Sequence, residues 1–391
     1  MDGRSLISIA RRWTQVAAIA LVSGAWAIAL PQAPGSASRA PVKQSASTNQ
    51  SEAEAELQTG ITLTRGGHFA EAIPHFLTAR GRVSDEYAAE FNLALCYVGT
   101  GQVGEAIGVL GELRKNGYEN AGVENLLAQA YAKSAQPNAA FEALHRAVGF
   151  TPKDEKLYLY VADAFLERQA QAQSLRVVEL GLQNVPDSAR LHYERGYLLS
   201  LLDELDLARP EFDRATALAP DSEIGYLAAA QKDFLDGSIP RSIQAARMGV
   251  RKGHPDYQLL ALLGEALLRE GASPGDSEFS EARNALEKSI TARPNYAGSQ
   301  IAMGHLLLLD EHLDQGIEHL EIGRVLDPKN LSVYALLGSA YRKRGQPERA
   351  KEMLAILTKL NQEQVRQIRT APGDQKAIPG ASRSARTEQK P

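Results

Sequence analysis

The chain has 391 residues, of which 44% are hydrophobic and 23% are charged, as is typical of a soluble folded protein. The net charge of −4 conceals a segregation, because residues 51–360 carry 43 acidic and 32 basic residues while both ends are basic. So acidic a body repels phosphates, which argues against nucleic-acid binding. Cys96 is the only cysteine, so an intramolecular disulfide and zinc sites built from several cysteines are excluded.

Residues 1–30 have the composition of an export segment. Three arginines precede an uncharged apolar run, Val16 to Leu30, which is followed by small residues. This order is typical of a signal peptide. Two alternatives stay open: cleavage near the end of the run, or an uncleaved anchor in which residues 13–30 attach the protein to the inner membrane. In both, the body of the protein is exported, to the periplasm or another extracytoplasmic space.

Residues 31–52 are rich in Pro, Ala and Ser and are predicted to form a flexible linker. A repeated body follows over residues 53–360. Small residues recur there at intervals of 34, with one interval of 40. The positions are Gly60, Ala94, Ala128, Ala162, Gly196, Ala230, Gly264, Gly304 and Gly338. Such a period is the signature of a stacked repeat architecture.

A second series of small residues has the same period and always follows the first series at the same spacing, once the insertion ASPGDS, Ala272 to Ser277, is set aside. The positions are Ala72, Ala106, Ala140, Ser174, Ala208, Ser242, Ala282, Gly316 and Ala350. One helical turn further on, the side chain is usually large and apolar, as Phe212 is. The two small residues of each repeat are predicted to meet where two antiparallel helices approach most closely.

The segments LALCYVGTGQVGEAIGVL, Leu93 to Leu110, and LGSAYRKRGQPERAKEMLAILTKL, Leu337 to Leu360, carry this pattern most clearly. They resemble the tetratricopeptide repeat, a helix–turn–helix unit of about 34 residues. The resemblance covers about nine repeats. It implies an all-α fold, a right-handed α-solenoid of antiparallel helix pairs with about eighteen helices. The first helix of each pair would line a concave groove.

Two features of the body interrupt this pattern. Pro74 and Pro210 fall in the second helix of their repeats, where we expect them near the helix start, because the first N–H groups of a helix have no internal acceptor. The insertion Ala272 to Ser277 is predicted to be a surface loop between the two helices of repeat seven. Beyond the body, residues 361–391 are predicted to extend the last helix with polar residues and then to form a disordered basic tail.

No phosphate-binding loop or HExxH motif is present in the sequence, and GASPG, Gly271 to Gly275, lacks the strand context of a nucleophile elbow. His305, His312 and His319 are spaced by seven and would share a face on one continuous helix, as a metal site requires. The repeat register instead places them on the first helix, in the turn and on the second helix of repeat eight. We therefore expect no cofactor, metal site or enzymatic activity. A metal-binding or catalytic accessory that uses these histidines remains an alternative.

The resemblance also implies where a partner would bind. Five positions of each first helix face the groove in this family, and in repeats four to six they include aromatic and aliphatic residues. Tyr193 and Tyr197 are one helical turn apart and share a face. The candidate partner-binding residues are Leu159, Leu166, Tyr193, Tyr197, Leu227 and Phe234.

The family's carboxylate clamp requires Lys and Asn on the first inner helix, where this sequence has Leu57 and Ile61, so we do not expect that clamp here. The sequence thus predicts a non-enzymatic scaffold of the cell envelope that binds a protein or peptide in its groove, in assembly or secretion. A structural spacer or self-assembling array is a further alternative.

Overall fold

The computed structural model describes residues 44–253 and 255–370, and within these ranges all regular structure is helical. The chain divides into two compact units, residues 1–327 and 328–391. The fold is an all-α solenoid of helix pairs, as the sequence predicts. The predicted export segment, residues 1–30, and the predicted tail beyond Thr370 lie outside the described residues.

The first unit contains sixteen described helices, α2 to α17, which form the eight predicted repeats. Their bounds are α2 Gln44–Arg65, α3 Phe69–Ala79, α4 Glu86–Gly99, α5 Val103–Lys115, α6 Ala121–Lys133, α7 Pro137–Phe150, α8 Glu155–Glu167, α9 Gln171–Asn184, α10 Ala189–Leu201, α11 Leu205–Leu218, α12 Glu223–Leu235, α13 Ile239–Val250, α14 Tyr257–Glu270, α15 Ser277–Ala292, α16 Ala297–Leu309 and α17 Leu313–Leu326. The second unit contains the ninth repeat, α18 Leu331–Lys343 and α19 Pro347–Thr370.

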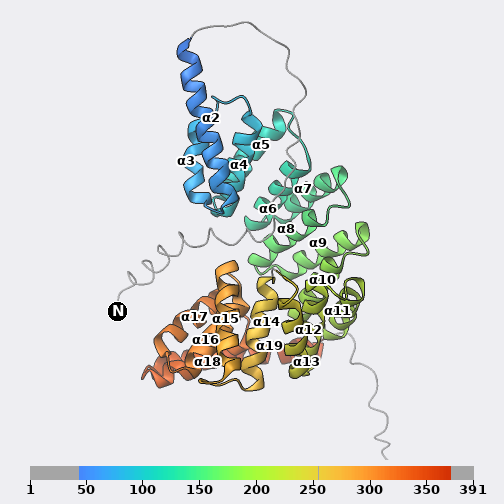
Figure 1. The fold of residues 1–391 in the computed structure, drawn as a ribbon. Coiled ribbons are helices and arrows are strands. Elements are labelled where there is room, and N and C mark those ends of the chain that lie inside the picture. Colours follow the sequence, from blue (N-terminus) through green and yellow to red (C-terminus); the bar gives the residue numbers. More distant parts are fainter. Residues whose placement is uncertain (1–43, 254, 371–391) are drawn as a thin grey trace, which may run out of the picture. The chain divides into compact units, whose positions relative to one another are not determined.

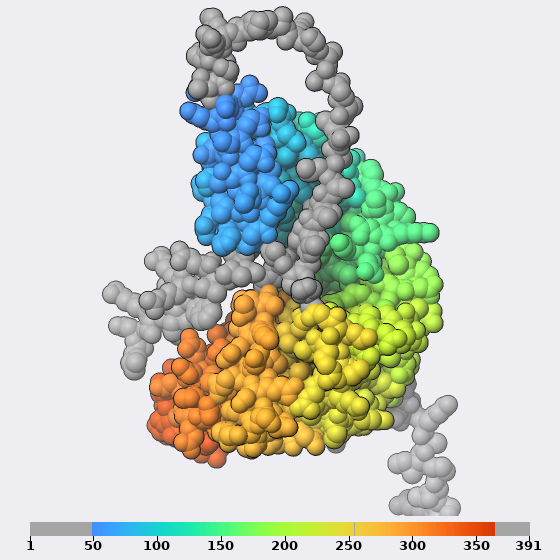
Figure 2. All heavy atoms as spheres, in the orientation of Figure 1, coloured from blue at the N-terminus to red at the C-terminus, as the bar shows by residue number. Residues whose placement is uncertain are grey.

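Within the first unit, each even-numbered helix packs against the odd-numbered helix that follows it, and the pairs succeed one another along a curved stack (Figure 1). The even-numbered helices also contact one another along most of the stack, so they form an inner layer. The atoms of α8 to α13, green to yellow in Figure 2, form one continuous surface. An amphipathic helix pair buries its apolar faces through this stacking, which it could not do alone.

The recurrent small residues lie where the paired helices touch, which confirms the prediction. A Cβ atom added to Gly196 would lie 2.9 Å from the ring of Phe212 and 3.1 Å from the carbonyl oxygen of Ala208. The same addition at Gly264 would lie 2.5 Å from Leu286. A larger side chain would therefore push the two helices apart, and the close packing offsets the helix-propensity cost of glycine.

Two of the small residues do more than provide space. The hydroxyl groups of Ser174 and Ser242 each donate a hydrogen bond of 2.8 Å to a carbonyl oxygen of the preceding helix, that of Ala162 and that of Ala230. Both serines are buried. They therefore tie their helix pairs together with a polar contact that the alanines at equivalent positions cannot make.

The prediction that Pro74 and Pro210 lie near helix starts is wrong in detail. Each is the sixth residue of its helix, α3 or α11, so each removes one internal hydrogen bond. Both prolines are exposed, so water can reach the carbonyl group left without its helical partner. By contrast, Pro137 and Pro347 are the first residues of α7 and α19, where proline costs least.

The predicted linker, residues 31–52, is wrong in its second part, because α2 begins at Gln44. Residues 44–59 contain neither glycine nor proline, and Ala, Gln and Glu are good helix formers, so the helix extends back from the repeat. The insertion of repeat seven does form a loop: α14 is followed by Gly271, whose φ of 109° favours glycine, and α15 begins at Ser277. α19 runs on to Thr370, so the last helix is extended as predicted.

The buried apolar residues of the first unit form two clusters that meet on α10. Leu191 and Leu198 belong to a cluster that extends through α2 to α9. Tyr193 and Leu199 belong to a second cluster that extends through α11 to α16. Because α10 contributes to both, it is the helix that connects the two parts of the core.

Candidate functional site

The inner layer of the first unit carries a network of charged and aromatic side chains that are distant in the sequence. The guanidinium group of Arg293, in the turn before α16, donates hydrogen bonds of 2.6 and 2.7 Å to the two carboxylate oxygens of Asp163 on α8. It also donates one of 2.7 Å to the hydroxyl group of Tyr257 on α14. The side-chain amide of Gln169 donates to the carbonyl oxygen of Leu326, which joins the ends of α8 and α17. Repeat four therefore touches repeats seven and eight directly.

A second arginine ties α10 to α14. Arg190 donates to a carboxylate oxygen of Asp256 at 2.7 Å and to the side-chain oxygen of Gln258 at 3.0 Å, and it pairs with Glu194 at 2.9 Å. Burial alone would lower the pKa of Arg190, but Asp256 and Glu194 together raise it well above its ordinary value. Burial raises the pKa of Glu194, and the charge of Arg190 opposes that shift.

Four tyrosines fill the space between these ion pairs. The rings of Tyr193 and Tyr197 stack with centroids 6.3 Å apart and an angle of 10° between their planes. The hydroxyl group of Tyr197 lies 3.4 Å from that of Tyr296, whose ring packs edge-on against Tyr257 at 5.1 Å. Burial is the main cause that raises the pKa of Tyr197, to about 12, so its hydroxyl group is neutral and can donate a hydrogen bond at physiological pH.

The six predicted partner-binding residues separate into two groups. Tyr193 and Leu227 are buried, with 1% and 0% of their surface exposed, and they belong to the second core cluster. Leu159, Leu166, Tyr197 and Phe234 are half-buried, so part of each remains accessible. The guanidinium group of Arg269 lies 4.8 Å from the centre of the Phe234 ring and covers one of its faces.

Sequence reasoning missed the residues that close this network. Arg293 and Tyr296 lie in the turn before α16, and Asp256 lies directly before α14, outside the five helix positions that the family resemblance assigns to the groove. Their side chains reach the inner helices, since Arg293 contacts Asp163 on α8 and Asp256 contacts Arg190 on α10. One sequence signal pointed to these residues. In the segment RPNY, Arg293 to Tyr296, a large arginine and a tyrosine occupy a turn before a helix, where short polar capping residues are usual.

The three histidines of repeat eight lie where the register predicts. His305 is on α16, His312 directly precedes α17, and His319 is on α17. His312 lies 3.3 Å from Asp310, whereas Nδ1 of His319 lies 2.7 Å from the side-chain oxygen of Gln300. Over residues 44–253 and 255–370, no three His, Cys, Asp or Glu side chains are grouped so that they could hold a metal ion.

The Cys96 thiol is buried in the first core cluster and lies 3.2 Å from the hydroxyl oxygen of Thr64. Burial raises its pKa to about 12, which keeps it protonated, as expected for a buried small side chain.

Among the helices of the described part of the chain, none has the length and apolar character needed to span a membrane.

Comparisons with known proteins agree with the repeat architecture. Family models described as tetratricopeptide repeats match residues 57–119, 189–222 and 331–364. The mitochondrial import receptor subunit TOM70 of Homo sapiens is 27% identical over 239 residues, and its counterpart in Rattus norvegicus is 26% identical over 242 residues. Both matches cover 58% of this chain but only 38% of the relative, so the chain spans about two fifths of the length of these curated proteins.

Solved structures with a similar helical arrangement include the APC/C hetero-tetramer Cut9-Hcn1, with 16% identity, a TM-score of 0.47 and coverage of 80% of this chain and 65% of that one. A tetratricopeptide repeat protein from Parabacteroides merdae has 16% identity, a TM-score of 0.45 and coverage of 67% and 99%. Matched repeat models occur near the start, the middle and the end of the helical body, in register with the recurring small residues. The chain is a tetratricopeptide-repeat protein.

Proposed function

We propose that the protein is a non-enzymatic scaffold that binds a protein or peptide partner along the inner layer of α8 to α12 and acts in the cell envelope, in assembly or secretion. The observation that carries the proposal is the composition of that layer. Tyrosine and arginine, the residue types that contribute most to protein interfaces, are concentrated there and are held in fixed positions.

The half-buried residues of the predicted site would make the contact. Leu166, Tyr197 and Phe234 are held by neighbours yet keep part of their surface accessible, so a partner would meet side chains that have already lost most of their conformational freedom. The buried members of the set, Tyr193 and Leu227, would support this surface from beneath. The relatives named as import receptor subunits support a protein-binding role, although they are much longer chains.

The cellular location is proposed from the sequence alone. A basic segment followed by an apolar run at residues 1–30 supports export across a membrane. Amino-terminal sequencing of the protein recovered from cell fractions tests this. A new amino terminus after about residue 30 in the periplasmic fraction is expected for a cleaved signal, and an intact terminus in the membrane fraction for an anchor. Recovery of the full-length chain in the cytosol would contradict export.

Site-specific photo-crosslinking in the native cell tests the binding surface. A photoreactive phenylalanine analogue in place of Phe234 or Leu166 should capture a partner, which mass spectrometry then identifies. Phe150, at the end of α7, is the matched control, because it is a 50% exposed aromatic residue that does not belong to the predicted inner surface. Equal capture from Phe150, or none from the two inner positions, would refute the proposed surface.

Purified protein and the captured partner then allow an energetic test. Tyr197→Ala and Phe234→Ala should each weaken binding at least about tenfold, as expected for anchor residues. Tyr197→Phe keeps the ring and should bind nearly as well as the wild type. If both alanine variants bound normally while remaining folded, the partner would have to contact another surface.

A further inference from the structure

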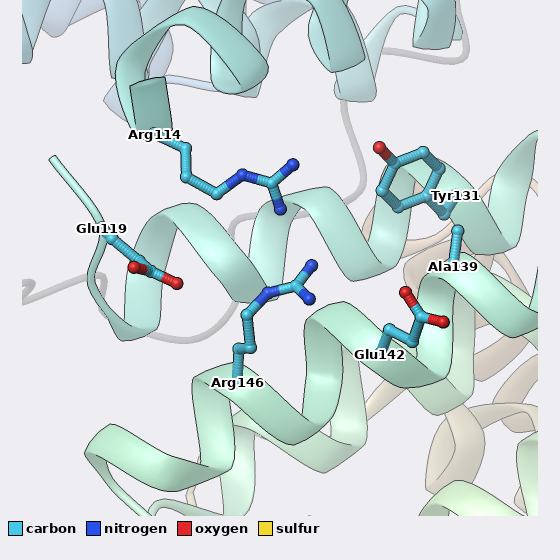
Figure 3. Close-up of a pocket in the computed structure, with 6 residues that line it drawn as sticks. All are labelled: Arg114, Glu119, Tyr131, Ala139, Glu142 and Arg146. Carbon is cyan, nitrogen blue, oxygen red and sulfur yellow. The ribbon is translucent and has the colours of Figure 1, made fainter. Parts of the chain in front are cut away.

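A cavity with a volume of about 370 Å³ lies among α5, α6 and α7, away from the inner positions described above. Its lining consists of Arg114, Glu119, Tyr131, Ala139, Glu142 and Arg146 (Figure 3). The guanidinium groups of Arg114 and Arg146 point toward one another across the centre, with Glu119 on one side and Tyr131 with Glu142 on the other. The volume is in the range of small-molecule sites.

The buried carboxylate of Glu124 lies against both arginines. The side chain of Glu124 is 0% exposed. One of its carboxylate oxygens accepts a hydrogen bond of 2.7 Å from Nε of Arg146, and the other lies 3.6 Å from Nη1 of Arg114. That second oxygen is buried and accepts no hydrogen bond. A buried acceptor in this state is costly unless a donor reaches it.

Several donors in the cavity also lack an acceptor. Among the described residues, Arg114 makes no hydrogen bond through its side chain, and Arg146 uses only Nε. The hydroxyl group of Tyr131 makes no hydrogen bond with a described residue either. Glu124 neutralises one of the two guanidinium charges, so one positive charge at the centre is not compensated. These groups would bind a carboxylate, which accepts two parallel hydrogen bonds from a guanidinium group.

The rest of the cavity favours a positive group. Glu119 and Glu142 are exposed and form no ion pair with a described residue, so together with the adjacent Glu124 three carboxylates lie against two arginines. This balance disfavours a doubly charged phosphate and favours a ligand that carries a positive group beside its carboxylate. A donor on such a ligand could also satisfy the buried oxygen of Glu124.

We propose that this cavity binds a small zwitterion of the free amino-acid class. Its carboxylate is held by Arg114, Arg146 and Tyr131, and its ammonium group is held by the acidic side chains. Because a carboxylate and an ammonium group are adjacent in an amino acid, the ligand matches the direct contact between Arg146 and Glu124. The site is independent of the proposed partner-binding surface, so either can fail without the other.

Titration of the purified full-length protein, followed by calorimetry or ligand-observed NMR, tests the proposal. The probes are free glycine, L-leucine, L-glutamate and L-lysine. Acetate and methylammonium serve as the two separate halves of the ligand, and inorganic phosphate serves as a competing anion. At least one amino acid should bind more tightly than acetate, methylammonium and phosphate. The proposal is overturned if acetate or phosphate binds as tightly, or if no amino acid binds at concentrations up to about 10 mM.

Two variants assign binding to the cavity. Arg114→Gln and Tyr131→Phe should each weaken amino-acid binding about tenfold, because each removes a donor to a charged group. Neither removes the close partner of Glu124, so both should keep the wild-type melting temperature without ligand. Arg168→Gln, an exposed arginine outside the cavity, is the control and should bind like the wild type. Wild-type affinity in both cavity variants would overturn the assignment.

Discussion

The two parts of the core that meet on α10 differ in the range of their polar contacts. Around α5 to α7, the buried Glu124 pairs with Arg114 and Arg146, which lie close to it in the sequence, within the same or the adjacent repeat. From the second part, ion pairs reach much further: Arg190 on α10 pairs with Asp256, 66 residues away, and Arg293 before α16 pairs with Asp163 on α8, 130 residues away. Repeats in a solenoid usually contact only their neighbours. The second part therefore adds contacts that should make distant repeats unfold together.

The largest expected effect is the loss of a buried aromatic side chain where the two clusters meet. Tyr193→Ala should lower the free energy of unfolding by about 3–5 kcal/mol, because it leaves a cavity beside Phe212 and Tyr197. Urea unfolding followed by circular dichroism measures this effect. The 50% exposed Phe150 is the control: Phe150→Ala should change stability by less than about 0.5 kcal/mol. Equal effects of the two changes would show that the buried ring of Tyr193 does not stabilise this part of the core.

A smaller effect should follow from removing the long-range ion pair. Arg293→Met leaves Asp163 without its close partner and should lower the free energy of unfolding by about 2–3 kcal/mol. This loss is smaller than for fully buried ion pairs, because the side chain of Asp163 is 31% exposed. Hydrogen-exchange mass spectrometry should show faster exchange in both α8 and α16.

The comparison variant lies in the first part of the core. In Arg114→Met, Glu124 keeps its hydrogen bond with Arg146, so the loss should stay below about 1 kcal/mol. Any faster exchange should be limited to α5 and α6. If Arg293→Met also had only local effects, the distant contacts would not couple the repeats.

The sequence allowed prediction of the features that depend on local spacing. Gly196, Ala208 and Phe212 recur at fixed intervals, and the structure brings them together as predicted because each helix pair repeats the same close approach. The start of α2 and the internal position of Pro210 were predicted less well, since helix ends depend on a balance of small propensities.

The ion pair between Arg293 and Asp163 could not be predicted from repeat spacing. Whether repeat four meets repeat eight depends on the rotation accumulated over four successive repeat interfaces, and small differences at each interface add up. The partial burial of the predicted site has the same cause. Tyr197 lies on the expected face, but only the path of the whole stack brings Tyr296 against it. The rotation accumulated over several repeat interfaces cannot be predicted from a single sequence.

The smallest expected effect is a change in the pH dependence of stability. Burial raises the pKa of Glu194 above its ordinary value of 4.5, although Arg190 opposes the shift and Asp256 and Asp163 reinforce it. The folded state therefore binds the proton of Glu194 more tightly than the unfolded state does. The corresponding stability is complete below the unfolded pKa and is lost as the pH rises through the raised folded pKa.

Glu194→Gln removes this proton-binding group from the second part of the core. As the pH rises above the ordinary pKa of 4.5, the variant should therefore gain stability relative to the wild type, as measured by urea unfolding at each pH. Glu105→Gln, an exposed change in α5, should leave the shape of the wild-type curve unchanged. A difference of the opposite sign would mean that ionised Glu194 is stabilised overall by Arg190. In that case the charged contacts of Arg190, more than the buried tyrosines, would hold this part of the inner layer together.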